Sequence, residues 1–384
     1  MFLLLVFCAG VFGAPIGSLL AVYVDSTLHQ GPGFTATLKV LQLVMTGIFA
    51  LVGGALADRI GQKRALLIGF AGLPLGLFVF SVNDFWILAA IVIALGMTSS
   101  MQTVGGQSYL VASVKQTHLG ALTATYYLGS TLGGAVGNAI AGSAAQRFGF
   151  TAVGSVGAIA SLSLLVAALL VLPDAPRHDE VTRPTGVSLV SDYFRLLGDR
   201  NIAMVGLIRF FTTCFYGTTS LLMPLLVFRL SGSVALASIY ATVSLVTATA
   251  TQFAVGRIID RTSVARPVRI LTAGVLITAI AASLSTHSLT AFFVTGVIGT
   301  SILWGLSTTM TSLARWTVGP ERQGKVLGLL HLLWSCGMLV GTAVAGALVT
   351  LEPALPFIAF GLLNIVSVIA AARVSQKMLL GVGA

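Results

Sequence analysis

The sequence GGALADRIGQKR, residues 53–64, ends one apolar stretch, residues 36–57, and leads into a second, residues 65–82. A helix of about twenty apolar residues crosses the roughly 30 Å hydrocarbon core of a bilayer, so each stretch is long enough to span a membrane. Gly61 allows a tight turn between them, and the cations of the segment suit the cytoplasmic headgroup layer. The segment therefore predicts a short cytoplasmic loop between two membrane-spanning helices.

Long apolar stretches and short polar loops alternate along the rest of the chain. Twelve spans are predicted, at residues 2–22, 36–57, 65–82, 86–112, 120–146, 151–172, 202–228, 235–256, 268–286, 290–314, 325–349 and 354–372. Composition agrees, because 8% of the residues are charged, against roughly 25% in an ordinary soluble domain, and mean hydropathy is +0.99. We therefore expect an all-α integral membrane protein with twelve transmembrane helices.

The Lys and Arg residues predict the orientation of these spans. With a cytoplasmic N-terminus, the outer loops hold only Lys39, Arg147 and Arg229, and Arg209 lies within a span. All the other cations then fall on the inner side, where cationic loops are retained. Both termini are therefore expected in the cytoplasm. The net charge of +10 is explained by this topology, so no nucleic-acid partner is expected.

The longest polar interval divides the chain into two groups of six spans. The expected domains are an N-terminal six-helix bundle (1–172), a cytoplasmic linker (173–200) and a C-terminal six-helix bundle (201–384). Part of the linker, residues 190–197, is a candidate surface helix. Four residues recur at one offset: Gly54, Asp58, Arg59 and Arg64 match Gly256, Asp260, Arg261 and Arg266. This repeat predicts two pseudo-symmetric halves, which is a known transporter plan.

The loop at residues 53–64 resembles the cytoplasmic loop motif of the major facilitator superfamily, Gly-x-Leu-Ala-Asp-Arg-x-Gly-Arg-Lys, and departs from it only at Gln62. The resemblance implies secondary transport and an inner gate, since the family's Asp couples to a helix of the opposite half and stabilises the outward-facing state. The candidate inner-gate residues are Asp58, Arg59, Arg64, Asp260 and Arg261. The second copy has Ser263 in place of the loop glycine. The alternative is that these charges only fix the topology.

The fifth predicted span is rich in glycine. Residues three and four apart share a helix face, so several of these glycines form one flat strip: Gly129, Gly133, Gly134 and Gly137. Drug:proton antiporters of the superfamily have a glycine-rich motif with proline here, but this span contains no proline. We therefore expect a strip for close helix packing rather than an antiporter motif.

Ionisable groups inside a bilayer are costly and tend to mark transport pathways. All 11 Asp and Glu residues lie at span ends or in loops, so no carboxylate is placed to carry a proton through the middle of the membrane. Arg209 is the deepest cation, about 12 Å into the seventh span at 1.5 Å per residue. It either binds a substrate anion, or it packs between helices with its head turned back to the interface.

Other polar and aromatic side chains in the spans are candidates for a central solute site. His331 is the candidate for proton coupling, because histidine changes charge near physiological pH, and Trp334 lies one turn further on. In the superfamily the fourth and tenth helices line the cavity, and they add Gln102, Gln107, Trp304 and Thr308. Packing between helices would explain each of these residues nearly as well.

Two charges at outer span ends suggest a second gate. Asp25 ends the first span, and Arg229 ends the seventh span at the equivalent place in the repeat. The first and seventh helices face each other across the cavity in the superfamily. We hypothesise an outer-gate ion pair that breaks when the protein opens outward. The alternative is two solvated charges.

The sequence offers no catalytic machinery. Cys8, Cys214 and Cys336 lie inside spans without disulfide or metal spacing, so we expect small core residues and no metal. There is no clustered ligand set and no phosphate-binding loop. Neither an enzyme nor a cofactor is therefore expected.

Three functions remain open. The scarcity of ionisable groups in the spans favours an efflux exporter of lipophilic or amphipathic compounds, coupled to protons or uncoupled. An importer or exchanger of an anionic metabolite is favoured if Arg209 faces the cavity. A non-transporting receptor or scaffold is the third. We expect a monomer that acts on a small-molecule solute in a bacterial inner membrane.

Overall fold

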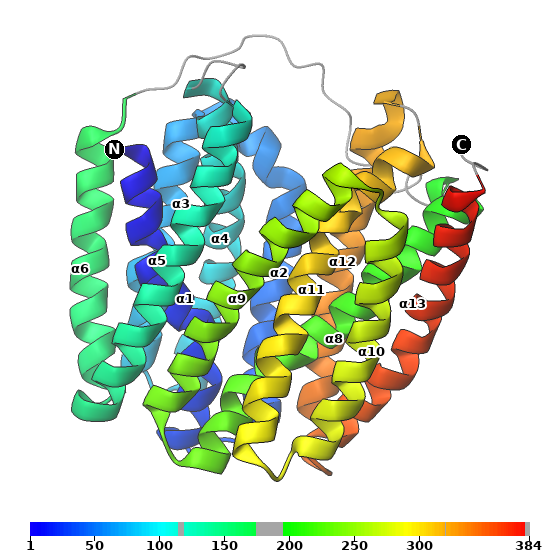
Figure 1. Ribbon diagram of the computed structural model, residues 1–384. Coiled ribbons are helices and arrows are strands. Elements are labelled where there is room, and N and C mark those ends of the chain that lie inside the picture. Colours follow the sequence, from blue (N-terminus) through cyan, green and yellow to red (C-terminus); the bar gives the residue numbers. More distant parts are fainter. Residues whose placement is uncertain (114–118, 174–194, 319, 381–384) are drawn as a thin grey trace. The chain divides into compact units, whose positions relative to one another are not determined.

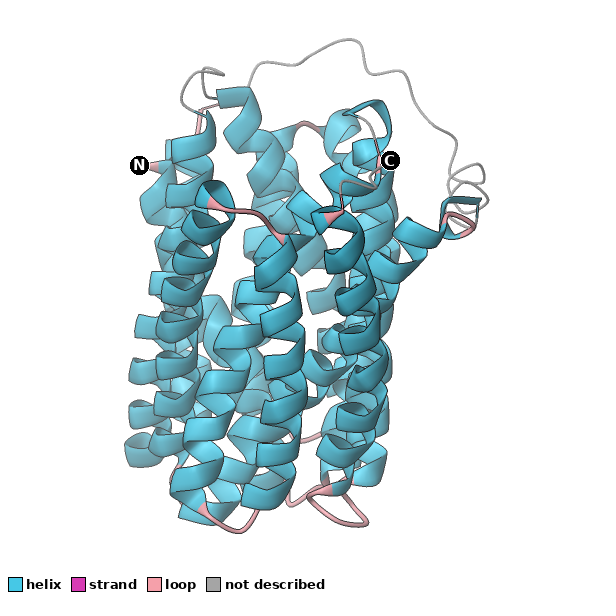
Figure 2. Cartoon of the chain, turned by 45° about the vertical axis from the view of Figure 1, so that its right-hand side comes forward, coloured by secondary structure: helices cyan, strands magenta, loops and turns pink. Residues whose placement is uncertain are grey.

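The structure is a computed structural model that describes residues 1–113, 119–173, 195–318 and 320–380. Its regular structure in that part is helical (Figures 1 and 2). The linker prediction falls mostly on residues 174–194, which lie outside the described residues. Residues 195–197, at the end of the candidate surface helix, are helical.

Contacts among the residues divide the chain into two compact units. Unit 1 comprises Met1–Thr182 and Ser231–Leu245, and unit 2 comprises Arg183–Leu230 and Val246–Ala384. The first part of one long helix, Val234–Arg261, therefore belongs to unit 1 and the rest of it to unit 2. The predicted boundaries of two six-helix halves stay a prediction.

Unit 1 is built from helices of the N-terminal part of the chain. They are α1 (Phe2–Ser26), α2 (Pro32–Ile60), α3 (Gln62–Phe78), the 3-10 turn η1 (Val79–Ser81), α4 (Phe85–Ser113), α5 (Leu119–Phe148) and α6 (Phe150–Val171). Helix α1 packs along α5, α4 contacts both α2 and α3, and α6 lies against α3. Most of these helices extend a few residues past the predicted spans, because a helix continues beyond the hydrocarbon into the headgroup region.

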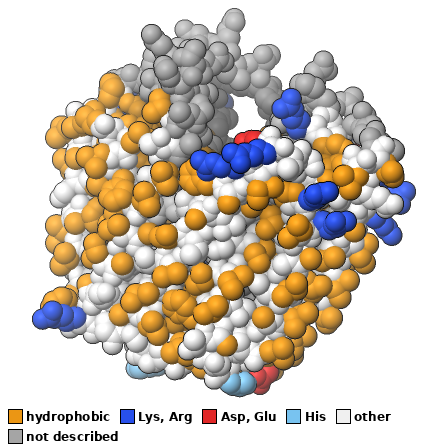
Figure 3. Space-filling view, viewed as in Figure 1, with side chains coloured by type: hydrophobic (Ala, Val, Ile, Leu, Met, Phe, Trp, Pro, Cys, Tyr) orange, Lys and Arg blue, Asp and Glu red, His pale blue; other side chains and the backbone are white. Residues whose placement is uncertain are grey.

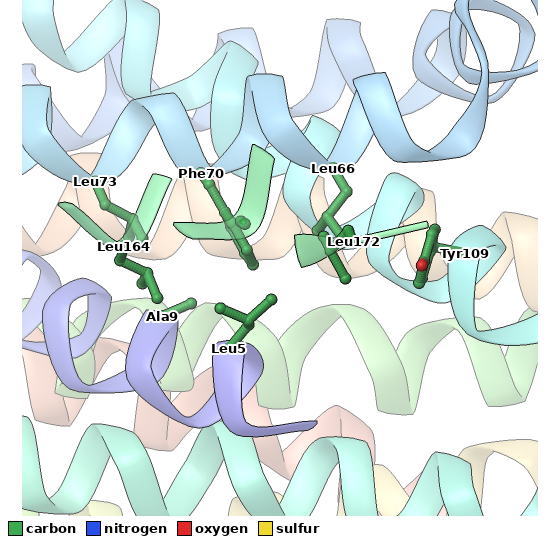
Figure 4. Close-up of a cluster of buried hydrophobic side chains, with 9 residues drawn as sticks. Leu5, Ala9, Leu66, Phe70, Leu73, Tyr109, Leu164 and Leu172 are labelled. Carbon is green, nitrogen blue, oxygen red and sulfur yellow. The ribbon is translucent and has the colours of Figure 1, made fainter. Parts of the chain in front are cut away.

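A cluster of buried apolar side chains joins four elements of unit 1 (Figure 4). Its members come from α1, α3, α4 and the C-terminal part of α6 with the residue after it: Leu5, Ala9, Leu66, Phe70, Leu73, Tyr109, Leu164, Ala168 and Leu172. The Tyr109 hydroxyl donates to the carbonyl oxygen of Pro173 at 3.0 Å. The polar end of this tyrosine is thus satisfied, and it holds the chain after α6 against α4.

The loop between α2 and α3 is a single-residue turn. Helix α2 ends at Ile60, α3 begins at Gln62, and Gly61 between them has φ of 94°. This left-handed conformation strains residues that carry a Cβ, so glycine suits the position. The prediction of a tight turn at Gly61 is confirmed.

The predicted glycine strip of α5 faces the backbone of α1. A Cβ added to Gly133 would overlap the carbonyl oxygen of Phe7, and one added to Gly137 would overlap that of Val11. On α1, a Cβ at Gly10 would overlap the carbonyl oxygen of Ser130. The two helices therefore meet backbone to backbone, and the packing role of the strip is confirmed.

Unit 2 contains the helices of the C-terminal part. They are α8 (Arg200–Ser231), the second part of α9 (Val234–Arg261), α10 (Ala265–Ser285), α11 (Leu289–Thr317), α12 (Pro320–Leu348) and α13 (Leu355–Leu379). Helix α10 packs on α11 and α13, and α12 contacts both α11 and α13. Helix α8 begins after Asp199, whose Oδ1 accepts hydrogen bonds from the backbone N–H groups of Asn201 at 2.7 Å and Ile202 at 3.2 Å. This is an N-cap.

Eleven helices are long and apolar enough, over their described residues, to cross a membrane. Large hydrophobic side chains lie exposed along them, including Leu170 at 76% and Leu284 at 80% (Figure 3). Exposed apolar surface of this kind suits a lipid environment. Helix α5 is the predicted span that is not among the eleven, because its glycine, serine and threonine residues lower its hydropathy.

The cysteines differ in environment. Cys214 on α8 is buried and Cys8 on α1 is half-buried, in keeping with apolar packing. Cys336 on α12 is exposed, so the expectation of a core residue is wrong there. A thiol is weakly polar, which lets it lie on the surface of an apolar helix.

Candidate functional site

Unit 2 contains a cavity of about 270 Å³ among helices α8, α9, α11 and α12. Its lining is Arg209, Thr212, Thr213, Tyr216, Gln252, Leu303, Trp304, Leu306, Ser307, His331 and Trp334. None of these described residues is acidic. A concave site with a few convergent polar groups is the usual form of a small-molecule site.

Arg209 brings a positive charge to this cavity. Its Nη1 donates to the hydroxyl oxygen of Ser307 at 3.1 Å. Its Nε is buried and has no hydrogen-bond partner among the described residues. A buried donor without a partner is destabilising, and more so when it is charged. The guanidinium therefore has one buried donor that no described residue satisfies.

Two aromatic pairs line the cavity beside Arg209. The indole Nε1 of Trp304 on α11 donates to the hydroxyl of Tyr216 on α8 at 3.3 Å. The rings of His331 and Trp334 on α12 stack with 5.5 Å between centroids and 22° between planes. These contacts fix the orientation of the rings before any solute binds.

The hydroxyl groups of the lining divide into two sets. Thr212 and Thr213 donate to backbone carbonyl oxygens of their own helix, each at 2.6 Å, so their hydrogens are already used. Ser307 accepts from Arg209, and Tyr216 accepts from Trp304, so each keeps its own hydrogen to donate. The cavity thus presents several donors around one cation, which is a surface suited to an acceptor-rich or anionic solute.

The structure brings together four of the predicted binding residues, Arg209, Trp304, His331 and Trp334. Thr308 does not line the cavity, and its hydroxyl donates to the carbonyl oxygen of Trp304 at 3.2 Å. The role of these five residues in solute binding stays a prediction.

Gln102 and Gln107 lie on α4 in unit 1. The Gln107 amide donates to the hydroxyl of Tyr127 on α5 at 2.6 Å. Gln102 marks a close crossing of α3 and α4, where a Cβ on Gly69 would lie 2.5 Å from the Gln102 nitrogen. Their part in solute binding is likewise still a prediction.

Sequence reasoning missed five polar members of the cavity: Thr212, Thr213, Tyr216, Gln252 and Ser307. Helical spacing carried a signal for four of them, because the first three lie three, four and seven residues after Arg209, and Ser307 lies three after Trp304. Residues at these spacings share a helix face. Gln252 had no such signal, since no candidate binding residue lay on its helix.

The candidate gating residues lie at helix ends. The inner-gate side chains of Arg59, Arg64, Asp260 and Arg261 are exposed, whereas the side chain of Asp58 lies outside the described residues. Asp25 is half-buried in the last turn of α1, and Arg229 is exposed in the last turn of α8. Both gates stay predictions.

Comparison with known proteins supplies the family. The model of the Major Facilitator Superfamily matches residues 2–314. No curated protein matches the sequence. A variant of the nucleoside transporter NupG has a similar structure, with a TM-score of 0.80 and 14% identity over 97% of this chain and 99% of that chain.

A POT family transporter in complex with 5-aminolevulinic acid is also similar, with a TM-score of 0.75 and 15% identity over 98% of this chain and 95% of that chain. At such identities these likenesses establish the fold alone. The family match covers most of the chain and agrees with the helical architecture. The chain therefore belongs to the major facilitator superfamily, and it is a multi-pass membrane protein and secondary transporter, not an enzyme.

Proposed function

We propose that this transporter carries a small organic anion and that Arg209 recognises the negative charge. The observation that carries the proposal is the guanidinium in the cavity of unit 2, with its buried Nε unpaired and no acidic residue among the described lining. A hydrogen bond to a charged group contributes about 1.5–3 kcal/mol. Loss of the guanidinium should therefore weaken anion binding about tenfold to 150-fold.

The electrical cost of moving an anion supports coupling to a proton. Moving one elementary charge against a potential of 100 mV costs about 2.3 kcal/mol, so entry of a monoanion into a cell that is negative inside is opposed. Carriage of one proton with the anion removes this cost. His331 is the proposed proton-binding group, because it lines the same cavity as Arg209.

Export of a lipophilic or amphipathic compound is the second candidate. It is favoured by a groove of about 560 Å³ in unit 1, lined only by apolar and glycine residues of α1, α3, α5 and α6. That groove has no charged group to orient a solute, whereas the cavity of unit 2 does. The position of Arg209 therefore favours the anion over the lipophilic solute.

The cations in the loops support a proposed orientation of the protein in the membrane. We propose a monomer in a bacterial inner membrane with both termini in the cytoplasm, because the cations gather in the loops that would then face inward. Alternating access would depend on gating by Asp58, Arg59, Arg64, Asp260 and Arg261 inside, and by Asp25 and Arg229 outside.

Thermal unfolding of the purified protein tests the proposal. The ligands are matched pairs, each a carboxylate and its uncharged amide. At 100 times its dissociation constant a ligand adds about 2.7 kcal/mol to the stability of the native state. We expect stabilisation by carboxylates alone, reduced to about 0.3–1.4 kcal/mol in Arg209→Gln and less reduced in Arg209→Lys.

The control variant is Arg269→Gln, since Arg269 is exposed near the start of α10 and does not line the cavity. It should respond to carboxylates as the unmodified protein does. Equal stabilisation by acids and amides, unchanged in Arg209→Gln, would refute anion recognition. Stabilisation by lipophilic cations alone would instead support the export candidate.

A further inference from the structure

The cavity of unit 2 places flat aromatic surface beside its cation. Four of its lining residues carry rings: Tyr216, Trp304, His331 and Trp334. The rings come from three helices, α8, α11 and α12, so they do not form one strip along a single helix. A ligand bound to Arg209 in this cavity would have aromatic side chains nearby.

These rings are held in place before a ligand arrives. The hydrogen bond of 3.3 Å from Trp304 to Tyr216 ties α11 to α8, and the stacked imidazole of His331 supports Trp334 on α12. Rigid walls lose little conformational entropy on binding. Such walls favour a flat, rigid ligand, because aromatic rings stack or meet edge to face at defined distances.

The free edge of Arg209 suits a carboxylate. Nη1 bonds to Ser307, and Nε is unpaired but almost wholly buried, so a carboxylate would pair with the Nε–Nη2 edge after a small movement of the Arg209 side chain. Two parallel N–H groups on one guanidinium edge match the two oxygens of a carboxylate. The hydroxyl hydrogens of Ser307 and Tyr216 add donors for the same acceptor.

The volume limits the size of the ligand. The cavity of about 270 Å³ lies just below the roughly 300–1,000 Å³ of pockets that hold drug-sized molecules. A single ring with a short acidic substituent suits this space. One cation in the lining also matches one negative charge.

We infer that the solute is a planar aromatic monocarboxylate, with its carboxylate on Arg209 and its ring between the Trp304–Tyr216 and His331–Trp334 pairs. The inference rests on the proposed function, since it presupposes that Arg209 binds an anion. It adds the chemical class of the solute, and it gives Trp304 and Trp334 the role of ring-binding residues.

Calorimetric titration with three probes of similar size tests the inference on the unmodified protein. Benzoate has both the ring and the charge, cyclohexanecarboxylate keeps the charge without a planar ring, and benzamide keeps the ring without the charge. An aromatic pair contributes a free energy that corresponds to about three- to tenfold in affinity. We expect benzoate to bind about three- to tenfold more tightly than cyclohexanecarboxylate and far more tightly than benzamide.

Two variants locate the preference. Trp334→Leu removes one ring of the wall, and the ratio of benzoate to cyclohexanecarboxylate affinity should fall toward one. Trp86→Leu is the matched control, because Trp86 is 77% exposed on α4 in unit 1. It should keep the ratio of the unmodified protein. The ratio is insensitive to a general loss of stability, which would affect both acids alike.

The outcomes separate the two proposals. Equal binding of benzoate and cyclohexanecarboxylate, both lost in Arg209→Gln, would overturn the aromatic class and leave anion transport standing. Equal binding of benzoate and benzamide, both kept in Arg209→Gln, would overturn both proposals. Absence of benzoate binding in the millimolar range would also overturn the aromatic class.

Discussion

The contact between α1 and α5 leaves no room for a methyl group at Gly137. A Cβ built there would overlap the carbonyl oxygen of Val11 and would lie 2.7 Å from the Cα of that residue. The obstacle is backbone, so no side-chain rotation relieves it and the helices must separate. Gly137→Ala should therefore destabilise unit 1.

The size of the effect follows from two opposed contributions. Overpacking costs about 1–3 kcal/mol, and an overlap with backbone belongs at the upper end of that range. Replacing glycine by alanine inside a helix returns about 1 kcal/mol through helix propensity. The expected net loss is about 2 kcal/mol.

Gly129 on the same helix is the matched control. A Cβ there would lie 3.7 Å from its nearest neighbour, the carbonyl oxygen of Leu3, which is an ordinary contact. Gly129→Ala should therefore leave stability unchanged or raise it by up to about 1 kcal/mol. The assay is thermal unfolding of both variants in one detergent. If Gly137→Ala unfolds at the same temperature as Gly129→Ala, or above it, the backbone contact between α1 and α5 is refuted.

Two further predictions concern charge. When the pH falls far enough to protonate His331, the cavity holds a second cation beside Arg209. Tyr216, which also lines the cavity and can titrate, stays neutral. The affinity for a carboxylate should therefore rise as the pH falls. Calorimetry at several pH values should show this slope, and His331→Gln should flatten it; an unchanged slope would exclude His331 as the proton site. If Asp25 and Arg229 form the outer gate, Asp25→Arg and Arg229→Asp should each impair uptake into proteoliposomes, and the double swap should restore part of it. No recovery in the double variant would remove the outer ion pair from the mechanism.

The all-helical membrane fold was predictable from the sequence because a bilayer permits few kinds of backbone structure. Every backbone polar group must be satisfied inside the membrane, so long apolar stretches become helices. The turn at Gly61 and the packing strip around Gly133 were both predictable from the properties of glycine. Glycine adopts a positive φ without strain, and its lack of a side chain lets two helix backbones approach closely. Helix α5 contains the predicted glycine strip, but its hydropathy is too low for it to be counted among the eleven spans. The cause is the same in both cases, because the small residues that allow close packing also lower the hydropathy.

The candidate site was predictable only in part. Arg209, Trp304, His331 and Trp334 stand out in the sequence because charged residues, histidine and tryptophan are few in the spans. Helical spacing indicated that Tyr216 shares a face with Arg209 and that Ser307 shares one with Trp304, but it did not show that α8 and α11 both line one cavity with these faces. The preference for lipophilic export came from the small number of ionisable groups in the spans. We propose an anion instead, because Arg209 is among the residues that line the cavity of unit 2.

Uptake into proteoliposomes tests the central claim most directly. The substrate is a radiolabelled carboxylate that stabilises the unmodified protein, and the proteins compared are the unmodified chain, Arg209→Lys, Arg209→Gln and Arg269→Gln at equal reconstituted amounts. At a substrate concentration well below saturation, anion recognition by Arg209 predicts full uptake in Arg269→Gln, reduced uptake in Arg209→Lys and uptake about tenfold to 150-fold lower in Arg209→Gln. Undiminished carboxylate uptake by Arg209→Gln would contradict it.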